Sequence, residues 1–175
     1  MLRHACVVAL LLTPMLASAQ TPEIASAVAF TEGPAVDRDG NVYFTEMVWQ
    51  RIMKLGADGV LSTFRERSNN ANGLLIDPEG RLVACEGAES QRTGVLVKFK
   101  PQVTRTDLRT GKIEMIADNY QGKPFVGPND VTIDGKGRLY FTDLAGAAVY
   151  RIDAPGQVAR ILAAPEIQRP NGSSI

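Results

Sequence analysis

The sequence predicts an all-β protein built as a β-propeller, and three observations support this prediction. One pattern occurs at residues 32–46, 72–86 and 129–143, and a further copy begins at residue 171. The copies recur about every 40 residues, which is typical of propellers with four-stranded blades. Short apolar segments alternate with turn-forming residues, and no stretch has helical periodicity. We therefore expect about three blades within residues 20–175, beginning near residues 32, 72 and 129, and an incomplete blade at 171.

Each copy of the pattern predicts a β-hairpin, because a polar residue and a short apolar strand are followed by an Asp-x-x-Gly turn and a second apolar strand. Two outer strands then complete each blade. The expected strands lie at 33–37, 41–46, 50–55 and 60–65 in the first blade, at 95–99, 104–107 and 113–117 after the second hairpin, and at 148–152 and 158–162 after the third. The interval between the second and third copies is longer, which indicates an insertion of roughly 15 residues.

The amino terminus has the features of a secretory signal peptide at residues 1–19. A weakly positive start is followed by an apolar run at residues 5–12, and Ala17-Ser18-Ala19 supplies a cleavage pattern before Gln20. The apolar run is well short of the roughly 20 residues that a membrane-spanning helix needs. We therefore expect a periplasmic or secreted protein that does not associate with a membrane.

The composition excludes several classes of active site. His4 is the single histidine, and it lies in the predicted signal peptide together with Cys6, so Cys85 remains as the sole cysteine. This excludes Ser-His-Asp and Cys-His catalysis, histidine zinc sites and a disulfide framework, and it makes Cys85 a candidate core residue. The 19 basic and 19 acidic residues form no basic patch, so we expect no nucleic-acid partner.

The first residue of each copy carries a side-chain oxygen: Glu32, Asn72, Asn129 and Asn171. The first strand of each blade lines the central channel of a propeller, so these side chains should approach a common axis. One carboxylate with several amide oxygens suits Ca²⁺, Mg²⁺ or Mn²⁺. Alternatively, Asn before Gly is a common turn former, although a turn preference does not account for Glu32.

Other polar positions also recur in register. Glu46, Glu86 and Asp143 end the second strands, and we interpret them as structural carboxylates or as support for the site. Trp49 and Gln50 follow the second strand of the first blade. They belong either to the core and a loop or to the mouth of a substrate site.

Three segments carry a resemblance to a known family: E-G-P-A-V-D-R-D-G-N-V-Y-F-T-E from Glu32, G-P-N-D-V-T-I-D-G-K-G-R-L-Y-F-T-D from Gly127, and R-P-N-G from Arg169. Over residues 27–175 the chain resembles the senescence-marker-protein/gluconolactonase/luciferin-regenerating-enzyme-like family. The resemblance implies a six-bladed propeller with one divalent metal in its central channel. Glu32 matches the family's glutamate ligand and Asn171 its asparagine ligand, while Asn129 matches the asparagine that binds the metal or the substrate beside it.

Two departures from the family pattern affect the expected chemistry. The family's aspartate that binds metal and acts as base or nucleophile would lie beyond Ile175. Animal members that act on sugar lactones carry Arg two residues before the middle Asn, where this chain has Gly127.

The leading functional hypothesis is a metal-dependent hydrolase that opens a small-molecule lactone or related ester. Glu32, Asn129 and Asn171 would bind the metal, for which Ca²⁺ is favoured over Mg²⁺, Mn²⁺ or Zn²⁺, and Asn72 and Asn129 would contact the substrate. One alternative is a non-catalytic extracytoplasmic propeller that binds carbohydrate or protein. Another is an inactive fragment, because the expected catalytic aspartate is missing and the ring is open. An open arc of blades also leaves apolar faces exposed, so we expect the fragment to be prone to self-association.

Overall fold

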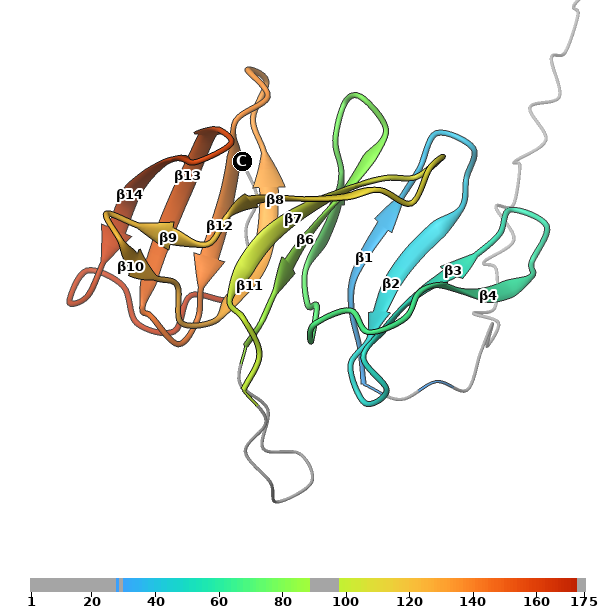
Figure 1. Cartoon of the computed structure of the whole chain (residues 1–175), viewed down its shortest axis with the longest axis horizontal. Helices are drawn as coiled ribbons and strands as arrows, with labels where there is room; N and C mark the ends of the chain where they lie inside the picture. Colours follow the sequence, from blue (N-terminus) through green and yellow to red (C-terminus); the bar gives the residue numbers. More distant parts are fainter. Residues whose placement is uncertain (1–27, 29, 89–97, 173–175) are drawn as a thin grey trace, which may run out of the picture.

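Three four-stranded antiparallel sheets follow one another along the chain and lie side by side in the computed structural model (Figure 1). The structure describes residues 28, 30–88 and 98–172, so the predicted signal peptide at residues 1–19 lies outside the described part. Within that part every regular element is a β-strand, and none is a helix that could span a membrane. The arrangement confirms the predicted propeller, with three blades.

The strands of each blade are joined in sequence order by hairpins. The first blade contains β1 Thr31–Val36, β2 Val42–Glu46, β3 Arg51–Leu55 and β4 Leu61–Arg65. The second contains β5 Leu74–Ile76, β6 Arg81–Glu86, β7 Gln102–Asp107 and β8 Ile113–Ala117. The third contains β11 Pro128–Ile133, β12 Leu139–Asp143, β13 Ala148–Ala154 and β14 Gln157–Ala163.

The longer middle interval includes an additional two-stranded hairpin, formed by β9 Asn119–Tyr120 and β10 Lys123–Pro124. Tyr120 packs against Tyr150 of the third blade, with ring centroids 5.6 Å apart, so the hairpin is joined to that blade. The strand expected at 95–99 is not found at residues 98 and 99, and residues 95–97 lie outside the described part. The third strand of the second blade begins at Gln102 instead.

The Asp-x-x-Gly turns form because the aspartate carboxylate accepts hydrogen bonds from backbone N–H groups of the turn. Asp77 Oδ1 accepts the N–H groups of Glu79, at 3.1 Å, and Arg81, at 2.8 Å. Gly80 donates its N–H to the Asp77 carbonyl at 2.8 Å and has φ of +78°, a conformation that favours glycine. The turns at Asp37 and Asp134 have the same pattern, and all three lie at one end of the blades.

The hydrophobic core lies between neighbouring blades. Tyr43 and Ile52 of the first blade pack with Leu74 and Leu82 of the second. A larger cluster joins the second and third blades: Val83, Cys85, Val103, Ile116, Ala117, Phe125, Val131, Leu139, Phe141 and Ile152. The buried position of Cys85 agrees with its interpretation as a core residue. Because each blade buries its faces against the next, the relative positions of the inner strands are fixed by this packing.

Candidate active site

The first strands of the blades approach one another closely at their starting ends, where the four candidate residues lie. Gly73 donates its N–H to the Asn129 carbonyl at 2.7 Å. A Cβ atom on Gly73 would lie 2.5 Å from that carbonyl oxygen, and one on Gly33 would lie 2.4 Å from the Asn72 carbonyl oxygen. No side chain fits at either position. The glycines that follow Glu32 and Asn72 are therefore required for close contact between blades.

This contact brings three of the four candidate side chains into one hydrogen-bonded chain. Asn72 Nδ2 donates to Asn129 Oδ1 at 2.9 Å, and Asn129 Nδ2 donates to Asn171 Oδ1 at 3.2 Å. The three amides come from the starts of three successive repeats. Asn72 Oδ1 is buried and has no hydrogen-bond partner in the described structure. A buried amide oxygen without a partner is unfavourable, so this atom is available to a ligand.

Glu32 lies beside this chain but its carboxylate is not joined to it. The Thr45 hydroxyl contacts two carbonyl oxygens, that of Glu32 at 3.0 Å and that of Asn72 at 3.1 Å, which fixes the two backbones next to each other. The Glu32 side chain is exposed. Among the described residues it is not hydrogen-bonded to the three amides. The structure therefore brings Asn72, Asn129 and Asn171 together and places the Glu32 backbone next to that of Asn72, without joining the Glu32 carboxylate to the amides.

Asp130 is a site residue that the sequence analysis missed. Its Oδ2 atom accepts hydrogen bonds from Asn129 Nδ2, at 2.5 Å, and from the Gly172 N–H, at 2.7 Å. It therefore supplies a carboxylate within the group of amides. The sequence does contain a signal. The second position of the repeat is glycine in three of the four copies, at Gly33, Gly73 and Gly172, but it is Asp130 in the copy that begins at Asn129.

Two of the in-register carboxylates fix the backbone around the same end of the blades. Glu46 accepts the N–H groups of Val48 and Trp49, each at 3.2 Å, and pairs with Arg51 at 3.1 Å. Asp143 accepts the N–H groups of Val126, at 2.9 Å, Gly127, at 2.7 Å, and Gly146, at 2.9 Å. Both side chains are buried. Their hydrogen bonds hold the adjacent loops in defined positions.

Glu86, the third of these carboxylates, joins two blades. Arg65 of β4 places Nη1 2.8 Å from Glu86 Oε1, and both side chains are largely removed from solvent. Thr104 donates to Glu86 Oε1 at 2.5 Å, while Asn69 and Gln102 donate to Oε2 at 3.2 and 2.9 Å. These contacts support the interpretation of Glu86 as a structural carboxylate.

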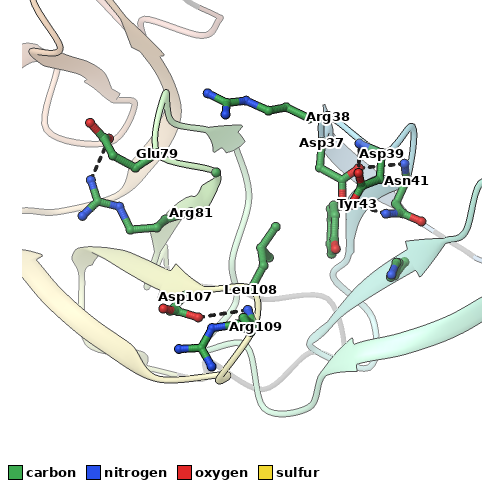
Figure 2. A pocket seen from close by; sticks show the side chains of 12 residues that line it. Asp37, Arg38, Asp39, Asn41, Tyr43, Glu79, Arg81, Asp107, Leu108 and Arg109 are labelled. Carbon is green, nitrogen blue, oxygen red and sulfur yellow. Dashed lines mark hydrogen bonds and ion pairs between the residues drawn. The ribbon is translucent and has the colours of Figure 1, made fainter.

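A separate cleft lies at the opposite end of the blades, between the turns of the first and second blades (Figure 2). It has a volume of about 540 Å³. Its charged side chains are equally divided between acids and bases: Asp37, Asp39, Glu79 and Asp107, and Arg38, Lys54, Arg81 and Arg109. Several of the acids accept hydrogen bonds within their own turns; the N–H groups of Arg109 and Thr110, for example, donate to Asp107 Oδ1. This cleft is distinct from the group of amides.

The Tyr43 phenol at this cleft is expected to ionise late in an alkaline titration. Burial, and then the negative charge of Asp37, raises the pKa of Tyr43 from 10.0 to about 12. Since the folded state favours the neutral phenol, this contribution to stability is complete below pH 10 and is lost between pH 10 and about 12. Tyrosinate absorbance of the protein and of Tyr43→Phe gives the measurement. A difference curve centred near the ordinary tyrosine pKa of about 10 would contradict the assignment.

The described residues contain no group of three or more His, Cys, Asp or Glu side chains that could hold a metal ion. Any cation bound by the described residues would therefore depend on amide or carbonyl oxygens in addition to carboxylates. The three amides, Asp130 and the neighbouring Glu32 supply such oxygens at the starts of the repeats. This donor set is hard and carries negative charge, and it therefore suits Ca²⁺ or Mg²⁺ better than a soft metal.

Comparisons with known proteins find relatives that are named as lactonases. The chain is 26% identical to a gluconolactonase of Zymomonas mobilis over 181 residues, which covers 87% of this chain and 47% of that protein. It is 28% identical to the lactonase drp35 of Staphylococcus haemolyticus over 117 residues, covering 66% of this chain and 33% of that protein. The chain thus spans about half the length, or less, of these relatives.

The fold has solved relatives as well. A gluconolactonase structure from Xanthomonas campestris superimposes with a TM-score of 0.66 at 24% identity, covering 78% of this chain and 48% of that one. This likeness supports the propeller fold. Residues 30–175, which include all three blades, match the SMP-30/Gluconolactonase/LRE-like region. The chain belongs to the SMP-30/gluconolactonase/LRE-like family.

Proposed function

We propose that the full-length protein is a metal-dependent hydrolase that opens a lactone or related ester at the starts of the inner strands. The observation that carries this proposal is the hydrogen-bonded chain from Asn72 through Asn129 to Asn171. It brings amide oxygens from separate repeats to one place, with a carboxylate on Asp130. The gluconolactonase and lactonase relatives support the choice of a lactone as substrate.

The residues at this place fit a divalent cation. Asn72 Oδ1 is buried without a partner, and rotation of an amide group exchanges its oxygen for its nitrogen at the same position. Glu32, Asn129 and Asn171 would hold the cation, with Ca²⁺ as the favoured metal. A divalent cation polarises a carbonyl and lowers the pKa of bound water, which are the requirements of ester hydrolysis without histidine.

The chain's own residues would position the substrate and the cation. Asn72 and Asn129 present amide groups that can donate to, or accept from, the oxygens of a lactone. Asp130 holds Asn129 and the Gly172 backbone through its Oδ2 atom. It is therefore a positioning residue that keeps the amides of the third and fourth repeats in register.

Asn129→Ala in the full-length protein is expected to lower kcat/KM for lactone hydrolysis by about 100-fold or more, since it removes the central member of the chain of amides. Glu32→Gln and Asn171→Ala are expected to weaken metal affinity by about 10- to 100-fold. Acid release from glucono-δ-lactone and from γ-butyrolactone would be followed in a pH-stat. A chelator should abolish turnover, and added Ca²⁺ should restore it.

The matched control is Asn119→Ala, because this exposed asparagine lies in β9, outside the group of amides. It should retain the activity of the unchanged protein. If the metal-loaded Glu32→Gln and Asn171→Ala variants both keep full turnover and unchanged metal affinity, the assignment of the metal ligands is wrong. Full activity after complete removal of divalent cations would reject metal dependence.

A further inference from the structure

Four exposed apolar side chains lie at the same end of the blades as the candidate active site. The exposed fractions are 73% for Trp49, 60% for Phe30, 50% for Val126 and 45% for Val48. We call these four residues the apolar rim. An exposed tryptophan accompanied by other large apolar side chains is typical of a binding surface.

The connections along the backbone place the apolar rim next to the site. Phe30 lies two residues before Glu32, and its carbonyl accepts the Met47 N–H at 3.2 Å, so residues 47–49 are adjacent to the start of β1. On the third blade, Asp143 accepts the Val126 N–H and is paired with Pro128, the residue before Asn129. The first and third blades therefore each contribute part of the apolar rim.

The loops of the apolar rim are held in place by buried carboxylates. Glu46, with 1% of its surface exposed, accepts the N–H groups of both Val48 and Trp49. Asp143 holds Val126 in the same way. Because these buried carboxylates fix the backbones of the loops, the apolar side chains are presented to solvent in defined positions. Less conformational entropy is then lost when the loops bind a ligand.

We propose that the apolar rim binds an alkyl or similar apolar tail of the substrate, so that the preferred lactones carry an apolar chain. This inference rests on the proposed function. The amides and carboxylates at the strand starts match the polar lactone ring, while the apolar rim beside them matches a tail attached to that ring. Removal of each further methylene from water should raise kcat/KM by up to about fourfold.

The test uses the full-length protein and γ-lactones with no tail, a short alkyl tail and a longer alkyl tail, alongside glucono-δ-lactone. We expect kcat/KM to rise with tail length, mainly through a lower KM. Trp49→Ala should remove most of this rise and leave γ-butyrolactone turnover within about twofold of the unchanged protein. Val60→Ala is the matched control, because Val60 is an exposed apolar residue in the turn between β3 and β4, away from the apolar rim.

Trp49 also gives a direct binding signal, which is the difference in tryptophan fluorescence between the unchanged protein and Trp49→Phe. Long-tailed lactones should change the tryptophan fluorescence of the unchanged protein, and this change should be absent in Trp49→Phe. γ-Butyrolactone should not change the fluorescence of either protein. Hydrolysis that is independent of tail length, or a rise that survives Trp49→Ala, would overturn the inference while the proposed function stands. A tail-dependent fluorescence change without hydrolysis of any lactone would support the apolar rim and reject the proposed function.

Discussion

Gly73→Ala is expected to destabilise the folded protein by about 1–3 kcal/mol and to abolish lactone hydrolysis, although the change adds a single methyl group. The new Cβ would lie 2.5 Å from the Asn129 carbonyl oxygen and 2.6 Å from Asp130 Cα. These neighbours are backbone atoms, so the second and third blades must separate for the methyl group to fit. Separation would break the 2.7 Å hydrogen bond from Gly73 and the Asn72–Asn129 contact.

Gly135→Ala is the matched control for this prediction. A Cβ on Gly135 would have no heavy atom within 4 Å, and its φ is not positive. Its stability should therefore stay within about 0.5 kcal/mol of the unchanged protein. Urea unfolding and lactone turnover of both variants in the full-length protein provide the measurement. Equal stability and activity of the two variants would show that close contact between the inner strands is not required.

The propeller could be predicted from the sequence because its repeat is local. Each hairpin is specified by residues that are close together, such as the Asp77 carboxylate and the N–H groups two and four positions later. The blade boundaries follow from the same pattern. Turn chemistry and alternation act over short distances, so they can be recognised before any tertiary contact is known.

The position of the amides was predicted for a related reason, whereas their contacts were not. A residue that recurs at the same place in each repeat recurs around the axis, so Glu32, Asn72, Asn129 and Asn171 were all expected to approach one another. The three amides do so, whereas the Glu32 carboxylate is not hydrogen-bonded to them. Asp130 was not predicted as a site residue, because its position is glycine in the other copies of the repeat and Asn before Gly is typical of a turn. The close packing that makes Gly33 and Gly73 necessary involves backbone atoms of neighbouring blades, which sequence periodicity does not reveal.

Irregular parts of the chain between the second and third copies of the repeat depend on tertiary structure. The hairpin of β9 and β10 is short, and Tyr120 places it against Tyr150 of the next blade. The partners of Glu86 include Arg65 in another blade and Gln102, which is 16 residues later in the sequence. Such contacts join residues far apart in sequence, so neither composition nor spacing predicts them.

Glu86→Ala is expected to destabilise the folded protein by about 3–5 kcal/mol, because it removes one partner of a buried ion pair and leaves the other without compensation. Arg65 would lose its carboxylate at 2.8 Å, and Thr104 and Gln102 would lose the acceptor that Glu86 supplies. Asn69 would keep a second acceptor, the Lys100 carbonyl oxygen at 2.8 Å. Unsatisfied buried donors add to the loss. Since Arg65 belongs to the first blade, the variant should also weaken packing between the first two blades.

Glu79→Ala provides the comparison that separates burial from charge. Glu79 forms an ion pair with Arg81 at 2.8 Å, but 63% of its side chain is exposed, so its loss should change stability by no more than about 1 kcal/mol. Both variants remove one negative charge from the second blade, and urea unfolding of the full-length protein measures both. A loss in Glu86→Ala no larger than that in Glu79→Ala would mean that the contacts of Glu86 do not hold the first two blades together.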